Sequence, residues 1–347
     1  MTRTVRISFV ISTSGRRRDT VQRLYQTIRD SIPDPKEIVL VGAVGDVADP
    51  AVKAVDARQD ALAGRICTMR NLGGEASAGE ILTFLDDDVE IDESWYPAAR
   101  PLLVRLRSGT ADIGNCRIIG PNGKRWFDWC WASREDPDCP PMLLPYGLVH
   151  PNLYVSGCCM IMRRDVWSSV LFDEKLLNHQ HDDVDFCHRC TDAGYRFSSQ
   201  PSATLTHLLE PAGRNPEDPA SGPDEFSVAV HKYREGSPRD ALELLEKAEG
   251  KVQQGVYHYY KGLFLLFLRD IPAAEKHLLI AQEELDANTH RALCGQVRYR
   301  LGLVALMRKA TQESERMFRA ALELVPEHPF ARARLRRLNG KPMALPS

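Results

Sequence analysis

The chain has 347 residues, of which 43% are hydrophobic and 27% are charged, and its formal net charge is −2. This size predicts two or three domains, and the near balance of charge gives no reason to expect nucleic acid as a partner. No apolar stretch approaches the ~18 residues needed to span a bilayer, and the first residues lack the features of a secretion signal, so we expect a cytoplasmic protein without a transmembrane segment.

Short apolar runs alternate with polar helical stretches over the first 207 residues. We expect strands at residues 7–12, 37–41, 65–69 and 81–85, and helices at residues 18–31 and 52–62. Apolar residues three and four apart indicate the helices, and short apolar runs bounded by turn residues indicate the strands. This order predicts an α/β domain with a largely parallel sheet.

The second part of the chain has a different composition. Residues 209–223 are rich in proline and glycine, which interrupt helices and central strands, so we expect an interdomain linker there. Residues 224–340 are expected to be helical and carry a pattern repeated at offsets of 33 and then 40 residues. The longer offset predicts an insertion of one or two helical turns near residues 286–291. Residues 341–347 are expected to form a flexible tail.

Three carboxylates, those of Asp86, Asp87 and Asp88, follow directly on the apolar run at residues 81–85. Adjacent anions repel one another, and a fold tolerates them when a cation shares their charge. Ligands of α/β proteins bind beyond the carboxyl ends of the strands, which is where these acids are expected. The cluster therefore indicates either a divalent-metal site for a phosphorylated substrate or an acidic turn exposed to water.

An ordered series of motifs surrounds this cluster. They are Arg70-Asn71-Leu72-Gly73, the acidic run itself, Val155-Ser156-Gly157, Phe172-Asp173-Glu174, His181-Asp182-Asp183 and Thr206-His207. The ordered set resembles the GT-A glycosyltransferases of family 2, which transfer a sugar from a nucleotide-sugar donor with inversion at the anomeric carbon. The resemblance implies a GT-A domain over residues 1–208, with a Rossmann-like mixed sheet.

The resemblance also implies a divalent metal site. A cation stabilises the negative charge that develops on the departing diphosphate. Asp88 and His207 are implied as metal ligands, and Asp86 is implied on the nucleotide side or in the metal shell. An imidazole beside a carboxylate suits Mn²⁺ somewhat better than Mg²⁺. For His207, a buried histidine at a strand end is the alternative.

A pair of acids is implied on the acceptor side. Asp183 aligns with the family's catalytic base, which takes a proton from the acceptor hydroxyl, and Asp182 replaces the more usual glutamate beside it. Both could instead only cap the helix expected at residues 184–192, although capping and catalysis are compatible.

The nucleotide side departs from the family pattern. Thr13 and Arg16 occupy the loop after the first strand, Arg70 is a plausible contact for ribose or diphosphate, and Asp87 is assigned to the turn. The acid that usually reads the base after the second strand is missing, and Asp46 could take its place. We expect a UDP-sugar as donor, with the base left open.

Two further clusters have less specific meanings. Trp126, Trp129 and Trp131 could stack on a sugar or a peptide, or could anchor a loop by burial. Cys187 and Cys190 lie three apart in a helical pattern, which favours helix packing over metal or redox chemistry. Nine cysteines, an odd count, are expected to be reduced.

The Gly, Ala, Phe or Leu, Ala and Pro positions of residues 224–340 resemble the tetratricopeptide repeat, with a generic helical bundle as the alternative. Repeat arrays bind helices or extended peptides. The leading hypothesis is a glycosyltransferase whose repeats recruit a peptide or protein acceptor or mediate homodimerisation. The alternatives are a surface-polysaccharide enzyme acting on a glycan acceptor and docked to a complex through its repeats, and a non-catalytic scaffold with a degenerate transferase domain.

Overall fold

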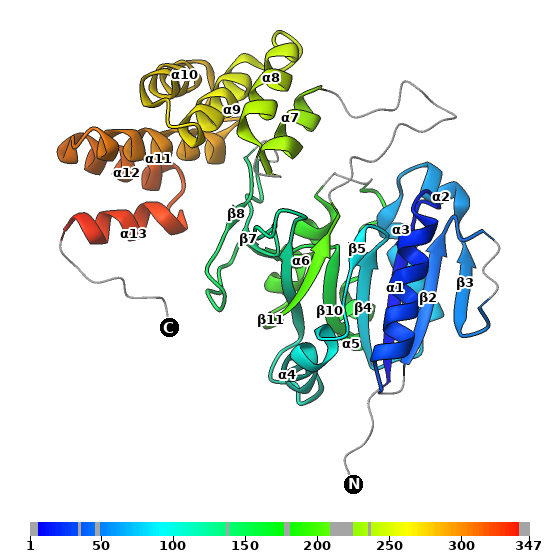
Figure 1. The fold of residues 1–347 in the computed structure, drawn as a ribbon. Helices are drawn as coiled ribbons and strands as arrows, with labels where there is room; N and C mark the ends of the chain where they lie inside the picture. The colour runs from blue at the N-terminus through cyan, green and yellow to red at the C-terminus, as the bar shows by residue number, and fades with distance from the viewer. Residues whose placement is uncertain are drawn as a thin grey trace. The chain divides into compact units, whose positions relative to one another are not determined.

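The computed structural model describes residues 6–33, 36–45, 49–136, 139–176, 181–208, 225–234 and 237–339. The chain divides into two compact units, one formed by residues 1–134 and 141–209 and the other by residues 135–140 and 210–347 (Figure 1). The predicted linker at residues 209–223, the predicted tail at residues 341–347 and the side chain of Asp46 lie outside the described residues.

The first unit is built on an eight-stranded mixed sheet with the order β3-β2-β1-β4-β10-β6-β11-β5. Strands β3, β2, β1 and β4 are parallel, β10 runs antiparallel between β4 and β6, and β5 runs antiparallel to β11. The bounds are β1 Ile7–Thr13, β2 Lys36–Gly42, β3 Val52–Asp56, β4 Ile81–Asp86, β5 Val89–Glu90, β6 Ile113–Ile119, β10 Cys159–Arg163 and β11 Phe197–His207.

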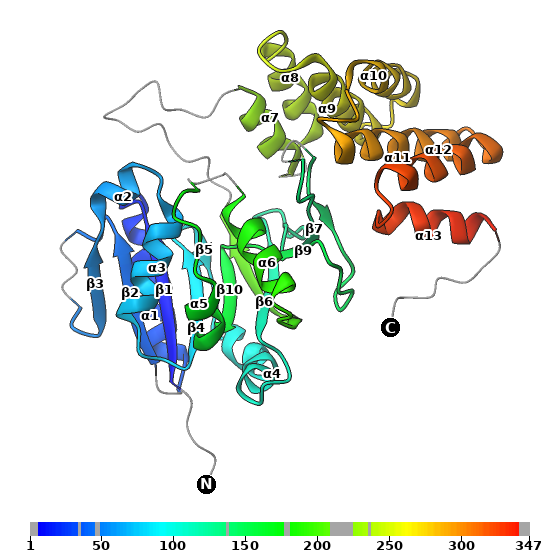
Figure 2. The same ribbon diagram turned by 180° about the vertical axis from the view of Figure 1, so that it is seen from behind.

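Helices cover both faces of this sheet. Their bounds are α1 Arg18–Ser31, α2 Arg58–Leu62, α3 Ile66–Ala76, α4 Trp95–Arg107, α5 Arg164–Val170 and α6 Asp182–Asp192. Apolar side chains of α1 and α4 form one core with alternate residues of β1, β2 and β4, among them Phe9. Alternate residues of a strand point to the same face of the sheet. Figure 2 shows α3 and α6 on the opposite face, where Phe84 of β4 packs through Phe172 against Phe186 of α6.

The predicted strands at residues 7–12, 37–41 and 81–85 and the predicted helix at residues 18–31 are confirmed. Two predictions were wrong. Residues 52–56 form an edge strand paired with β2 before the short helix α2, and residues 66–69 begin helix α3. Short segments have weak intrinsic preferences, so pairing with β2 and burial of one face of α3 against the sheet decided them.

A small second sheet carries most of the tryptophan-rich segment. It has the order β8-β7-β9, with bounds β7 Trp129–Trp131, β8 Met142–Leu143 and β9 Leu153–Val155. Trp129 and Trp131 are buried, and Trp129 Nε1 donates a hydrogen bond to the Leu148 carbonyl at 2.9 Å. Of the two interpretations of these tryptophans, the structure favours anchoring by burial.

All nine cysteines are free and buried. Cys187 and Cys190 lie on α6, and burial raises the pKa of the Cys190 thiol to about 12 and that of Cys187 above its usual range. Both side chains are buried on α6, which fits the expectation of helix packing.

The described part of the second unit is helical apart from its connections. The bounds are α7 Glu225–Arg234, α8 Pro238–Lys247, α9 Gln254–Phe267, α10 Ile271–Glu284, α11 Arg291–Met307, α12 Thr311–Leu324 and α13 Pro329–Leu338. Successive helices pair as α7 with α8, α9 with α10 and α11 with α12. The predicted α/β domain with a mixed sheet, followed by an all-α region, is therefore confirmed. Among the described residues, we find no helix with the length and apolar content required to cross a membrane.

The change in repeat offset comes from longer helices. The connections from α8 to α9 and from α10 to α11 have the same length, whereas α10 has 14 residues against 10 in α8, and α11 has 17 against 14 in α9. These additions account for the difference between the offsets of 33 and 40. At the close contact inside the last pair, a Cβ on Gly302 would lie 2.6 Å from the Phe318 ring.

Candidate active site

The predicted site residues gather at one edge of the sheet because of strand register. Ser12 of β1 lies beside Asp86 of β4, so the loop after β1 and the acidic turn after β4 are neighbours. The turn leads into β5, where Val89 pairs with His207 at the end of β11. The Leu208 backbone amide also donates to the Asp88 carbonyl at 2.8 Å. Residues about 120 positions apart in sequence therefore meet at the carboxyl ends of the parallel strands, the edge where such folds bind ligands.

Asp88 and His207 form a pair suited to holding a metal ion. His207 Nε2 lies 3.4 Å from Asp88 Oδ1, and that oxygen is buried without a hydrogen-bond donor among the described residues. The imidazole stacks against Trp126, with 5.5 Å between ring centroids and 13° between ring planes. A buried acceptor oxygen beside a positioned imidazole is the donor set that Mn²⁺ or Zn²⁺ accepts.

The described residues hold no group of three or more His, Cys, Asp or Glu side chains arranged to bind a metal. Asp88 and His207 could supply two ligands, and water and substrate oxygens could fill further positions. That is the usual arrangement where a divalent cation is shared between a protein and a bound diphosphate. Asp86, whose place in the metal shell stays a prediction, accepts a hydrogen bond from Arg70 at 3.2 Å.

Asp87 organises the loop after β1. Its Oδ2 accepts hydrogen bonds from Thr13 Oγ1 at 3.0 Å, from the Ser14 backbone amide at 2.9 Å and from Ser14 Oγ at 3.0 Å. Its Oδ1 accepts one from Arg17 Nη1 at 2.9 Å. The predicted nucleotide residues Thr13 and Asp87 therefore bind one another and fix the loop that follows the first strand.

Arg17 is the site residue that the sequence did not identify. The prediction named Arg16, whose side chain is exposed, whereas the Arg17 side chain is only 15% exposed and faces Asp87 and Asp88. The run Arg16-Arg17-Arg18 gave no indication of which guanidinium group turns inward, because this depends on where α1 begins.

Arg70 connects the acidic turn to the helix on the acceptor side. It is 4% exposed, and its guanidinium donates to the Asp182 carboxylate and, at 3.2 Å, to Asp86 Oδ1. Burial opposes the charge of this guanidinium, but the carboxylates of Asp182, Asp86 and Asp183 outweigh that effect and raise the pKa of Arg70. Burial also raises the pKa of Asp86 to about 6, although Arg70 opposes this.

Asp183 lies in the first turn of α6, one residue after its start, and is held by backbone amides. Its Oδ2 accepts a hydrogen bond from Gly157 N at 3.0 Å, and its Oδ1 accepts one from Val184 N at 2.9 Å. Burial and the neighbouring charge of Asp182 raise the pKa of Asp183 to about 7. A carboxylate with a pKa near neutrality is suited to accept a proton from a hydroxyl group.

Gly157 is the point where these groups come closest. A Cβ at this position would overlap the Arg70 guanidinium, while the Gly157 amide holds Asp183. A residue with a side chain would therefore displace either the guanidinium or the strand end. Gly157 therefore contacts both groups: its lack of a side chain leaves room for the Arg70 guanidinium, and its amide donates to Asp183.

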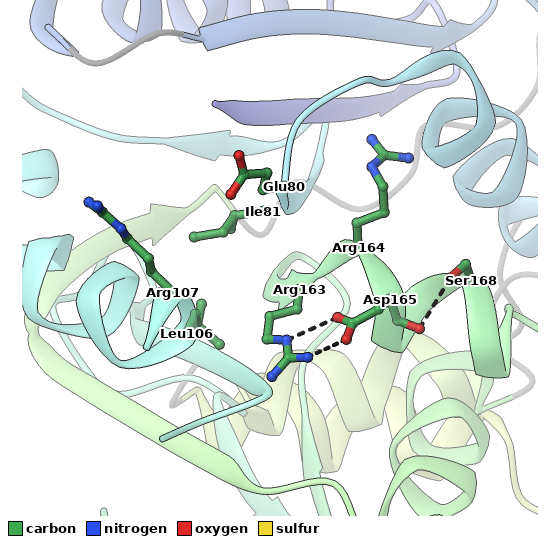
Figure 3. Close-up of a pocket in the computed structure, with 8 residues that line it drawn as sticks. All are labelled: Glu80, Ile81, Leu106, Arg107, Arg163, Arg164, Asp165 and Ser168. Carbon is green, nitrogen blue, oxygen red and sulfur yellow. Dashed lines mark hydrogen bonds and ion pairs between the residues drawn. The ribbon is translucent and has the colours of Figure 1, made fainter. Parts of the chain in front are cut away.

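A hollow of about 450 Å³ lies at the opposite ends of β4 and β10 and contains none of the predicted site residues. Arg163 in this hollow is paired with Asp165 (Figure 3). It also forms an ion pair with Asp112. The lining of the hollow consists of Glu80, Ile81, Leu106, Arg107, Arg163, Arg164, Asp165 and Ser168. The candidate site is therefore the opposite edge of the sheet, where the acidic turn lies, and not this hollow.

No protein-family model matches the chain, and no curated protein matches it. Among solved structures, the chain is similar to GalNAc-T7 with UDP, GalNAc and Mn²⁺, at 13% identity and a TM-score of 0.48. That likeness covers 80% of this chain and 55% of the other, so the chain spans about half of that protein.

The chain is also similar to the mannosyltransferase PcManGT from Pyrobaculum calidifontis in complex with GDP-Man and Mn²⁺, at 14% identity and a TM-score of 0.45, covering 93% of this chain and 88% of the other. A third likeness is to S. aureus TarS 1–349, at 13% identity and a TM-score of 0.42, covering 93% and 91%.

Proposed function

We propose that this chain is an inverting glycosyltransferase of the GT-A type that uses a divalent metal ion and a nucleotide-diphospho-sugar donor. The observation that carries the proposal is the meeting of the Asp88 and His207 pair with the acidic turn at the carboxyl edge of the parallel strands. We assign the catalytic domain to residues 1–208 and a tetratricopeptide-like domain to residues 224–340.

Asp88 and His207 would hold Mn²⁺ or Mg²⁺, which supplies charge stabilisation for the departing diphosphate. Asp87 keeps the loop at Thr13 and Ser14 against this turn, so that backbone and small side chains can face the nucleotide. We favour a UDP-sugar as donor. Asp46, which lies outside the described residues, and backbone groups of this loop are our candidates for the contact with the base.

Asp183 is our candidate for the base that takes the acceptor hydroxyl proton as the anomeric carbon is attacked from the opposite face. Its raised pKa, about 7, suits that role. Asp182 and Arg70 act as positioning residues, because the Arg70 guanidinium ties Asp182 at the start of α6 to Asp86 at the end of β4.

The test is nucleotide release from a panel of UDP- and GDP-sugars in the presence of Mn²⁺. We expect release with one donor, and its loss in Asp88→Ala but not in Glu93→Ala, which removes an exposed carboxylate five residues further on. Absence of release across the panel, together with absence of metal-dependent UDP or GDP binding by calorimetry, would reject the enzyme and favour a scaffold.

The acceptor class is tested with the full chain and a donor carrying a radioactive sugar. Phe267 and Met307 are exposed apolar residues at the ends of α9 and α11, one repeat offset apart. Such side chains can contact a peptide. If the helical domain recruits a peptide, the label becomes protease-sensitive, and Phe267→Ser with Met307→Ser lowers transfer while leaving donor hydrolysis unchanged. Label in polysaccharide instead supports the surface-polysaccharide alternative.

A further inference from the structure

The Arg17 guanidinium contacts the carboxylates of both Asp87 and Asp88. Its Nη1 lies 2.9 Å from Asp87 Oδ1 and 3.5 Å from Asp88 Oδ2. It therefore supplies positive charge to both carboxylates, which reduces the repulsion between them. Asp88 is at the same time the acid suited to a metal ion, through its other oxygen beside His207.

The two contacts of Arg17 are unequal. Asp87 receives three other hydrogen bonds, from Thr13 and Ser14, all at Oδ2, and its Oδ1 holds the guanidinium at 2.9 Å. Asp88 has no such set of donors among the described residues, and its contact with Arg17 is the longer one. A metal ion at Asp88 would place a second cation beside the guanidinium, so the two compete for the same carboxylate.

After displacement from Asp88, the Arg17 guanidinium could bind phosphate oxygens of the donor. Arg17 stands at the end of the loop between β1 and α1, beside the acidic turn and at the carboxyl edge of the strands. A diphosphate bound to a metal at Asp88 would bring phosphate oxygens to the same place. Guanidinium groups bind such oxygens through paired hydrogen bonds.

We propose that Arg17 is a diphosphate-binding residue that neutralises Asp88 in the free protein and exchanges that carboxylate for the donor diphosphate when metal and donor bind. This inference rests on the function proposed above. It predicts that Arg17 opposes binding of the metal alone and favours binding of the metal together with a nucleoside diphosphate.

The test measures both equilibria by titration calorimetry on the full chain, first with Mn²⁺ alone and then with UDP and with GDP at saturating Mn²⁺. Removing an exposed or partly exposed ion pair changes an affinity by roughly twofold to fivefold. For Arg17→Met we expect Mn²⁺ alone to bind tighter by about that factor, and the nucleoside diphosphate to bind at least tenfold more weakly.

Two further variants make the test specific. Arg18→Met removes the same charge from the next, exposed residue, and we expect it to leave both affinities close to those of the wild type. Arg17→Lys keeps the charge without the paired donors, so Mn²⁺ affinity should stay near the wild-type value while nucleoside diphosphate binding weakens. A folding defect would weaken both binding equilibria and lower the melting temperature. Tighter Mn²⁺ binding together with weaker nucleoside diphosphate binding would therefore exclude a folding defect.

The outcomes separate this inference from the proposed function. If the wild type binds Mn²⁺ and a nucleoside diphosphate but Arg17→Met changes both affinities in the same direction, or neither, the exchange is refuted and the proposed function stands. If the wild type shows no metal-dependent binding of UDP or GDP, the proposed function fails and the exchange fails with it.

Discussion

Replacing Asp183 with asparagine is expected to remove activity and to stabilise the fold at the same time. The pKa of Asp183 is about 7, whereas a free aspartate titrates near 4. Because the folded protein binds this proton more tightly than the unfolded chain, the contribution of Asp183 to the free energy of unfolding falls as the pH rises from about 4 to about 7. Above that range the loss is complete.

The difference between these pKa values corresponds to at most about 4 kcal/mol. The carboxylate is partly exposed and accepts two backbone hydrogen bonds. Solvent and those amides stabilise its charged form and so reduce the loss of folding free energy. We therefore expect Asp183→Asn to raise the free energy of unfolding by about 1 to 2 kcal/mol at pH 8, with little change at pH 4.

Urea unfolding of the wild type and the variant at intervals from pH 4 to pH 8 measures this difference, with exposed Asp19→Asn as the control. Transfer should fall roughly a hundredfold or more in Asp183→Asn, because general-base catalysis is lost. In the wild type, the rate should rise with pH through about 7 as Asp183 ionises. A stability difference that does not vary with pH would refute the electrostatic reasoning, and retained transfer would refute the catalytic role.

Three further changes test other parts of the structure. Asp88→Ala should abolish the increase in melting temperature that Mn²⁺ produces together with UDP or GDP, as measured by differential scanning fluorimetry, and an unchanged increase would contradict the ligand role. Gly157→Ala should displace the Arg70 guanidinium and lower kcat more than it changes donor KM, whereas wild-type kinetics would show that this close approach is unimportant. Gly302→Ala should force Phe318 to move and reduce the free energy of unfolding by about 1 to 3 kcal/mol in calorimetry, and a neutral effect would mean that the helix pair tolerates wider spacing.

Much of the acidic site could be anticipated because it depends on local sequence. The run at residues 81–85 ends in carboxylates, and any strand that ends at the carboxyl edge of an α/β sheet exposes the residues that follow it. The strands β1, β2 and β4 and the helix α1 were also predictable, since long apolar periodicity reports directly on a buried face. The short segments at residues 52–56 and 66–69 were misassigned because their structure depends on neighbouring strands and on burial.

Partners within the site depended on the tertiary structure. Nothing in the sequence indicates that Arg70 would bind Asp86 and Asp182 rather than only face a ligand, because the three residues come from α3, β4 and α6. The choice of Arg17 over Arg16 likewise depends on the point at which α1 begins. The tryptophan segment could have stacked on a ligand or anchored a loop, and the small sheet that buries it decides between them.

Local sequence was enough to predict an α/β domain with an acidic turn at a strand end, followed by helices that repeat at offsets of 33 and then 40 residues, because apolar periodicity and turn residues act locally. Long-range strand pairing and helix packing establish which charged side chains meet. Pairing of Val89 with His207 brings the imidazole to Asp88, and the contact of Arg70 with Asp182 brings the start of α6 to the end of β4. The energy of a charge depends on its neighbours and its burial, and strand order and register set both.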